Sequence, residues 1–390
     1  MDYLLGHEKI NKEKKKKLGR LTSLEIQAQP KTWKATFNKI LNEKENFSSF
    51  LNEVLDLSDL QIVITGAGSS GFIGDVIAST WKNLFFHSVQ AIPTTELVTH
   101  FENKILTDAP LLLISIARSG NSPESTATFR IANELCDNVY HLIITCNPNG
   151  QLAAKAQENT YIFLLPPKAE DKSLAMTNSF TSMALAGSLI PRILKGDVEA
   201  INSELNSLIR YGENILRNYT NYLFEISKID FDRVVFLGSG SKLGIAKESH
   251  LKVQELTNGE IIGKFDSFLG FRHGPKSIIN KNSLIVYLLS NNSLVHKYER
   301  DLIRQINEHN IPLTTFLIAE SEISPLESDY SIILNDSSEI DDDLWSIICS
   351  LPAQIIGFYK SLALSYNPDN PSPNRMISRV VEGVTIYDYA

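Results

Sequence analysis

Short apolar runs alternate with amphipathic segments along most of the chain. The runs are rich in Ile, Leu and Val, and each ends in a turn that leads into a segment with helical periodicity. Near-continuous apolar runs are typical of parallel strands covered on both faces, so the pattern predicts βαβ units. In the first half the expected strands are residues 61–65, 88–92, 111–116, 141–145 and 161–164.

The same rhythm begins again in the second half. A long helical stretch, residues 178–227, precedes a second series of expected strands at 233–237, 284–288, 312–318 and 330–334. The turn TGAGSS at residues 65–70 is echoed by LGSGSK at residues 237–242. A repeat of this length indicates two α/β domains, each a doubly wound parallel sheet in a flavodoxin-like three-layer αβα arrangement.

Helices are expected to flank the two domains. Thr22–Glu25 resembles a capping box that opens a helix ending near Pro30, and a second helix is expected at 32–55. Another is expected at 344–364, before a tail rich in Asn and Pro. The predicted division is a helical arm at 1–57, domains at 58–200 and 201–366, and a tail at 367–390.

Composition narrows the class of protein. The 390 residues are 43% hydrophobic and 21% charged, as in globular proteins of two domains. A net charge of −8 argues against a general nucleic-acid binder, and the basic run Lys14–Lys17 is expected to be a solvated stretch. With no apolar leader and no run of membrane-spanning length, we expect a cytosolic protein. Cys136, Cys146 and Cys349 lack zinc spacing and are expected to be buried free thiols.

Small and polar residues follow two strands of the first domain. Gly68, Ser69 and Ser70 come after the first strand, and residues 115–124, SIARSGNSPE, end another. In a parallel sheet these segments meet at the carboxyl edge, where backbone amides and helix N-termini favour an anion. Hydroxyl groups donate hydrogen bonds to phosphate oxygens and Arg118 supplies positive charge, so we expect a phosphate site.

The glycines of the first turn are also compatible with a purely structural role or with a dinucleotide site. A Gly-x-Gly pair marks any tight turn between a strand and a helix. Gly66, Gly68 and Gly71 have the spacing of a dinucleotide fingerprint as well, but the next strand ends in Pro93 and Thr94 rather than in an acidic ribose partner. A phosphate carried on a sugar fits the residues better.

The chain resembles the tandem SIS (sugar isomerase) domain family, whose best-known member is the isomerase half of glucosamine-6-phosphate synthase. The motifs are GAGSS at 66–70 with RSGNSPES at 118–125, and SFLGFRHGP at 267–275. Together with LEIQAQP at 24–30, they are most similar to the bacterial galactosamine-6-phosphate deaminase/isomerase branch, also called tagatose-6-phosphate ketose/aldose isomerases. The resemblance covers nearly the whole chain from about residue 61.

The resemblance implies roles for particular residues. It implies phosphate contacts at Ser69, Ser70, Arg118, Ser119 and Ser122, and a sugar site near Gly68. It also implies a carboxylate base, carried over to Glu255, and an acid/base histidine, carried over to His273. Lys252, one helical turn before Glu255, could then stabilise negative charge on an enediol-like intermediate.

Each of these roles has a structural alternative. Glu and Lys at this helical spacing usually form only a surface pair, and a single His is more often a structural hydrogen-bonding residue. His273, however, lies in a Gly-Pro turn on a loop rather than in an apolar stripe. Thr177, in the segment 174–182, is a further candidate substrate contact by resemblance.

The C-terminal tail and an acidic cluster contain further candidate site residues. Residues 373–380, PNRMISRV, resemble the tail that closes over the sugar in the synthase, with Arg379 in place of a lysine that can form a Schiff base. A guanidinium stays protonated, so an imine at this position is not expected, although Arg379 could stabilise charge. Asp341–Asp343 is interpreted as the acidic N-terminus of a helix, with metal binding the lesser alternative. No cofactor and no metal are expected.

The leading hypothesis is conversion of galactosamine 6-phosphate to tagatose 6-phosphate with loss of ammonia. Because the sequence shows no N-terminal cysteine or glutaminase-like domain, we do not expect synthesis from glutamine. The rivals are deglycation of a fructosamine phosphate, simple ketose/aldose isomerisation, and a sugar-phosphate sensor with a helix-turn-helix domain. A homodimer is expected because in this family the His-Gly-Pro loop reaches a neighbouring subunit.

Overall fold

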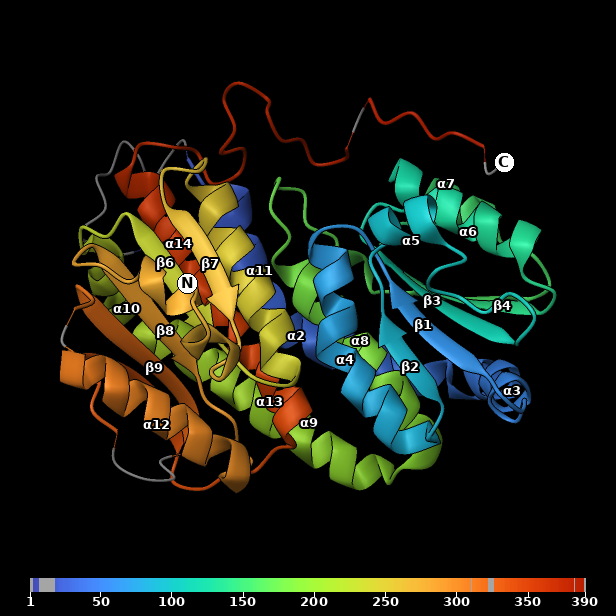
Figure 1. Ribbon diagram of the computed structural model, residues 1–390, viewed down its shortest axis with the longest axis horizontal. Helices are drawn as coiled ribbons and strands as arrows, with labels where there is room; N and C mark the ends of the chain where they lie inside the picture. The colour runs from blue at the N-terminus through green and yellow to red at the C-terminus, as the bar shows by residue number, and fades with distance from the viewer. Residues whose placement is uncertain (1–2, 7–17, 310, 322–325, 382, 389–390) are drawn as a thin grey trace. The chain divides into compact units, whose positions relative to one another are not determined.

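The computed structural model describes residues 3–6, 18–309, 311–321, 326–381 and 383–388. The chain divides into two compact units. One contains Lys31–Glu170, Asn178–Ile201 and Arg375–Ala390; the other contains Asn202–Asn374, Asp171–Thr177 and the described part of Met1–Pro30. Each unit is built on its own parallel sheet (Figure 1).

The first unit carries a five-stranded sheet in the order β2-β1-β3-β4-β5. Every pairing in it is parallel, and β1 lies between β2 and β3. The strands are β1 (Gln61–Thr65), β2 (Ser88–Ala91), β3 (Leu111–Ala117), β4 (Val139–Thr145) and β5 (Thr160–Leu164). Strand β3 is buried along its whole length, as its unbroken apolar sequence predicts.

Helices cover both faces of this sheet (Figure 1). On one face Leu97 and Ile131 pack with Val63 and Leu113 of the strands. Leu97 belongs to α5 (Thr94–His100) and Ile131 to α6 (Pro123–Leu135). The short α7 (Gln151–Ala154) lies beside α6 on this same face, where Leu152 packs with Phe129. The other face carries α4 (Ser69–Phe85), α8 (Asn178–Lys195) and α3 (Lys44–Leu55). The predicted doubly wound, three-layer architecture is confirmed.

The second unit has the same strand order. Its sheet runs β10-β9-β8-β6-β7, which places its first strand between its second and third as in the first unit. The strands are β6 (Arg233–Leu237), β7 (Ile262–Asp266), β8 (Ser283–Leu288), β9 (Thr314–Ser321) and β10 (Tyr330–Asn335). Residues Leu302 and Ile306 of α12 (Ser293–His309) pack with Val235 and Ile285 on one face.

Helix α11 (Ser241–Leu256) contacts β6 and β7, and α14 (Ser350–Ala363) packs on α11. This unit also contains α10 (Thr220–Lys228), α13 (Asp342–Ile348) and the part of α9 (Val198–Asn214) from Asn202 onward. A π-helical segment, Ile215–Tyr219, joins α9 to α10. The helix expected at 344–364 is divided into two helices, α13 and α14, which meet at Cys349.

One expected helix boundary is wrong. Helix α2 runs from Arg20 to Asn42 and passes through Pro30 instead of ending there. Proline lacks an N–H, so the carbonyl of Ile26 loses its usual partner. The side-chain amide of Gln29 donates to that carbonyl at 3.0 Å and replaces the missing hydrogen bond.

The expected capping box is also wrong. Glu25 does not cap the helix, because its carboxylate accepts hydrogen bonds from the backbone of Lys172 and Ser173 instead. These residues belong to the Asp171–Thr177 segment of the same unit. All three cysteines are free and buried, as expected. Among the described residues, no helix is both long and apolar enough to span a membrane.

Candidate active site

The loop between β1 and α4 is shaped by glycines. Gly68 has φ 55° and ψ −129°, a left-handed conformation that side-chain-bearing residues rarely adopt. A Cβ atom on Gly66 would lie 2.6 Å from the backbone of Ser70, so only glycine allows the turn to close this tightly. The turn brings Ser69 and Ser70, both buried, to the first turn of the 17-residue helix α4.

The loop after β3 has a similar construction. Gly120 has φ 63°, and Ser122 is the N-cap residue of α6. The Ser122 hydroxyl donates to the Glu124 carboxylate at 2.6 Å, and the Ser119 hydroxyl accepts from the backbone N–H of Asn121 at 3.2 Å. A second helix N-terminus therefore opens at the same edge of the sheet.

These two loops are neighbours because their strands are paired. Thr65 at the end of β1 lies opposite Ser115 of β3 in the parallel register. From β1 the chain continues to β2 on one side, and it later returns to place β3 on the other, so this is the topological switch point where open α/β sheets bind ligands. The structure thus brings together the predicted residues Gly68, Ser69, Ser70, Arg118, Ser119 and Ser122, here named the first cradle.

Arg118 provides the positive charge of the first cradle. Its side chain is only 7% exposed, and one guanidinium nitrogen donates to the backbone carbonyl of Arg379 at 2.8 Å. The Arg379 side chain pairs with Glu170, also at 2.8 Å. A guanidinium, serine hydroxyls and two helix N-termini form a donor set suited to a phosphate dianion.

Helix α11 carries the candidate acid/base group. Lys252 is fully buried, and its ammonium nitrogen lies 2.8 Å from Glu255 Oε2 and 3.1 Å from Glu248 Oε1. Burial lowers the pKa of Lys252, but the two carboxylates outweigh burial and raise it above its ordinary value. Lys252 is therefore held as a cation between two carboxylates.

The two carboxylates differ in exposure. The Glu255 side chain is 22% exposed, whereas the Glu248 side chain is 1% exposed. Glu255 can therefore reach a substrate and Glu248 cannot. Sequence reasoning missed Glu248; its position four residues before Lys252 on a predicted helix was the available signal.

The His273 loop follows β7. Phe268 and Phe271 anchor the loop in the core of the second unit. His273 itself is exposed, and Gly274 after it has φ 116°, which favours glycine. The two phenylalanines therefore hold the loop against the core, and His273 is exposed to solvent.

Thr177 lies in the same unit as Glu255 and His273. Its hydroxyl donates to Asp171 at 3.1 Å and its backbone N–H to the same carboxylate at 2.8 Å. Both residues are fully buried. The Thr177 hydroxyl thus holds the Asp171–Thr177 segment, and its contact with substrate stays a prediction.

The predicted residues fall into two sets. The first cradle and Arg379 belong to one unit, and Glu255, Lys252, His273 and Thr177 belong to the other. Within each unit the structure brings neighbours together as described. That the two sets serve one substrate stays a prediction.

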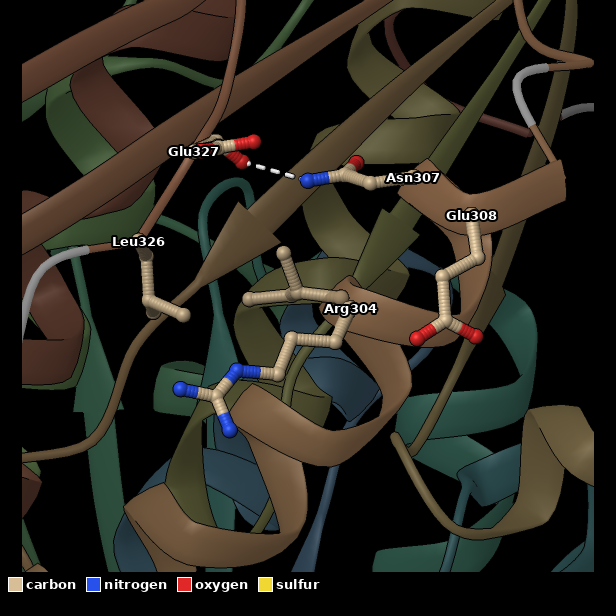
Figure 2. Close-up of a pocket in the computed structure, with 6 residues that line it drawn as sticks. Arg304, Asn307, Glu308, Leu326 and Glu327 are labelled. Atoms are coloured by element: carbon tan, nitrogen blue, oxygen red, sulfur yellow. Dashed lines mark hydrogen bonds between the residues drawn. The ribbon is translucent and has the colours of Figure 1, made fainter.

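Two surface pockets formed by the described residues lie at the opposite edge of the sheets. Figure 2 shows one between the last turns of α12 and the segment before β10, where the Asn307 amide donates to the Glu327 carbonyl at 2.7 Å. Another, lined by residues that include Gln61 and Ser88, lies where β1 and β2 begin. Both are at amino ends of strands, away from the helix N-termini that favour an anion.

Known proteins match this chain both at the level of one domain and over nearly the whole sequence. The SIS domain family model matches residues 58–190, which contain the first cradle. A D-galactosamine-6-phosphate deaminase, AgaS, from Shewanella sp. (strain ANA-3) is 37% identical over 374 residues, covering 94% of this chain and 92% of that protein.

Solved structures support the same relationship. The crystal structure of tagatose-6-phosphate ketose/aldose isomerase from Escherichia coli matches with a TM-score of 0.87 and 32% identity, covering 95% of this chain and 97% of that one. The C-terminal domain of a glucosamine-fructose-6-phosphate aminotransferase from Francisella tularensis shares the fold, with a TM-score of 0.76 and 17% identity over 88% of this chain and 96% of that one. With relatives this similar over almost its full length, the chain belongs to the AgaS family of galactosamine-6-phosphate deaminases, SIS-domain proteins of the sugar-phosphate isomerase type.

Proposed function

We propose that this protein converts galactosamine 6-phosphate and water to tagatose 6-phosphate and ammonia. The observation that carries the proposal is the pairing of Glu255, a partly exposed carboxylate, with the buried ammonium group of Lys252 at 2.8 Å. A partly exposed carboxylate that a fixed cation holds in place is positioned to act as a base. The choice of sugar rests on the name of the Shewanella relative.

The chemistry assigns a step to each group. Opening of the sugar ring frees an aldehyde at C1, with His273 moving a proton to O5. Glu255 takes the proton from C2. The Lys252 ammonium group is buried behind Glu255, so it would stabilise the negative charge that develops on O1 through its electric field and not by contact. The proton then returns to C1 while one amino proton passes to O1, which leaves a hydroxyl group on C1 and an imine at C2. Water then adds at C2, and ammonia leaves to give the ketose phosphate, so the reaction is a hydrolysis of a C–N bond without oxidation or reduction.

The first cradle is proposed to hold the phosphate group of the sugar. Arg118 and the hydroxyls of Ser69, Ser70, Ser119 and Ser122 would bind its oxygens. The Arg379 carbonyl accepts from Arg118, which supports a tail that closes on the active site. Because its guanidinium cannot form an imine, we assign Arg379 a role in charge stabilisation only.

We further propose a cytoplasmic homodimer. The observation that favours it is the exposure of His273, because a catalytic histidine on an exposed loop needs another surface to enclose it. Residues of a neighbouring subunit would complete that surface. The histidine would then act on a sugar bound by the partner chain.

Simple ketose/aldose isomerisation is the second candidate, favoured by the name given to the Escherichia coli structure. The two activities differ in one product, ammonia. Purified protein should be given galactosamine 6-phosphate, glucosamine 6-phosphate and galactosamine, with ammonia followed by a coupled assay. We expect release from galactosamine 6-phosphate and little from the unphosphorylated sugar. Absence of ammonia from both phosphates, with interconversion of tagatose 6-phosphate and its aldose, would replace deamination with isomerisation.

A further inference from the structure

The loop after β6 repeats the conformation of the loop after β1. Gly240 has φ 61° and ψ −135°, and Gly68 has φ 55° and ψ −129°. A Cβ on Gly238 would lie 2.5 Å from the backbone of Lys242, just as one on Gly66 would meet the backbone of Ser70. Lys242 therefore occupies in the second unit the position that Ser70 occupies in the first.

The surroundings of the two loops also correspond. Strand β6 pairs with β8 as β1 pairs with β3, so each loop lies beside the loop that follows the third strand of its sheet. In the second unit that neighbouring loop supplies Ser290 and Asn291, directly after Leu289. The 16-residue helix α11 starts at this point, as α4 does in the first unit. We name this group of donors the second cradle: Lys242, Ser290 and the backbone N–H of Asn291.

An anion already occupies the second cradle, and it belongs to the chain itself. The carboxylate of Asp342 lies 2.5 Å from Lys242 Nζ, accepts from the Ser290 hydroxyl at 2.7 Å, and accepts from the Asn291 N–H at 2.6 Å. Lys242 is fully buried and also donates to the Asp342 backbone carbonyl at 3.2 Å. An ammonium, a hydroxyl and a backbone amide converge on one carboxylate, as they would on a phosphate.

The electrostatics agree with a resident anion. Burial raises the pKa of Asp342, but Lys242 and the neutral donors outweigh burial and lower it below its ordinary value. The carboxylate is therefore ionised across the neutral range. Asp342 is also the first residue of α13, and the preceding residue, Asp341, caps that helix by accepting from the Asp343 N–H. The cap fixes the backbone that carries the carboxylate.

We infer that the second cradle is an oxyanion site closed by the Asp342 carboxylate, so that the chain takes sugar phosphate at the first cradle only. The inference uses the proposed function solely for the assignment of the first cradle. It explains why one of two similar switch points carries a lysine where the other carries a serine. Removal of the carboxylate should leave the buried Lys242 without its ion-pair partner, at a site open to solvent because the Asp342 side chain is 32% exposed.

The test counts phosphate sites in the full-length protein. Inorganic phosphate is titrated calorimetrically into the wild type, Asp342→Ala, Asp343→Ala and the double variant Lys242→Met/Asp342→Ala. We expect Asp342→Ala to bind one more phosphate per chain than the wild type. The neighbouring change Asp343→Ala and the double variant should add none. No additional site in a folded Asp342→Ala protein, or an additional site that survives Lys242→Met, would overturn the inference.

Thermal unfolding supplies a second readout if Asp342→Ala is weakly folded. At about 100 mM phosphate its Tm should rise by about 5 °C more than that of the double variant, because only Asp342→Ala gains a site. Equal shifts in the two variants would count against the inference. The gain of one site does not depend on activity, whereas failure of the proposed function appears as absence of ammonia release by the wild type.

Discussion

Lys252 Nζ lies 2.8 Å from Glu255 Oε2, one helical turn further along α11, and the lysine is the more deeply buried of the two. Glu248 contacts the same ammonium from the other side at 3.1 Å. The arrangement divides two tasks between two carboxylates. Glu248 balances the buried charge, and Glu255 faces the solvent, where a substrate can reach it.

Loss of Lys252 should lower the free energy of unfolding as well as the activity. Lys252→Met leaves Glu248 buried without its cation, which costs about 3–5 kcal/mol of unfolding free energy. The double variant Glu248→Gln/Lys252→Met removes both buried charges and should recover most of that loss. Urea unfolding of the three proteins measures the difference. Equal stability of the single and double variants would show that Glu248 does not depend on Lys252.

Arg118 should control the affinity for the phosphate group. A hydrogen bond to a charged group is worth about 1.5–3 kcal/mol, so Arg118→Met should lower kcat/KM for the phosphorylated sugar by about 10-fold to 150-fold. Arg118→Lys should keep part of the affinity through its charge. Steady-state kinetics measure the effect of each change. Arg130→Met, which removes a surface ion pair with Glu134, is the control for loss of an arginine charge. A loss in kcat alone would argue that Arg118 acts elsewhere than at the phosphate.

His141 should make the fold sensitive to acid. The residue is fully buried in β4 and accepts a hydrogen bond from Asn133 on its Nε2 atom at 3.0 Å, which requires a neutral ring. Burial lowers the pKa of His141 from 6.5 to about 3. Between these values the unfolded chain binds the proton and the folded chain does not, so stability falls as the pH falls, by up to about 1.4 kcal/mol per pH unit.

The measurement is the free energy of unfolding between pH 7 and pH 4 for the wild type and His141→Gln. The variant should lose less stability over this range because the titrating imidazole is gone. His309→Gln, at the exposed end of α12, should follow the wild type. Parallel curves for all three proteins would show that His141 is not protonated on unfolding in this range.

The proposed dimer can be tested by mixing inactive variants. If His273 acts on the sugar bound by its partner, a Glu255→Gln/His273→Asn heterodimer retains one complete site. An equal mixture allowed to exchange subunits should then regain about a quarter of wild-type activity, since half of the dimers are heterodimers with one of two sites intact. Activity that never rises above that of the separate variants would place both residues in the same chain.

The fold was predictable where local sequence determines it. Strands such as β3 are buried on both faces, so they appear as unbroken apolar runs. Strand β7 was missed because it pairs with β6 alone at a sheet edge and contains glycine, lysine and aspartate. The passage of α2 through Pro30 depends on the Gln29 side chain, which sequence patterns do not reveal.

The candidate site, too, was predictable only where local sequence determines it. The first cradle could be predicted because glycines and serines at strand ends form local turns whose neighbours follow from the strand order. The spacing of Glu248 four residues before Lys252 was visible in the sequence, but the burial of both side chains was not. The Lys242–Asp342 pair could not be predicted, because its two residues are 100 positions apart. A helical acid and a helix N-terminal aspartate have the same sequence pattern whether they are solvated or buried.

Deamination with Glu255 as the base is measured by product formation from galactosamine 6-phosphate with the wild type, Glu255→Gln and Glu308→Gln. Glu308 is an exposed glutamate on α12, so its change controls for loss of a surface charge. We expect equal amounts of ammonia and tagatose 6-phosphate from the wild type and Glu308→Gln, and a rate lower by about 10²-fold to 10⁴-fold in Glu255→Gln. Ammonia release by a folded Glu255→Gln protein at the wild-type rate would remove Glu255 from the reaction, and no ammonia from the wild type would rule out deamination of this sugar.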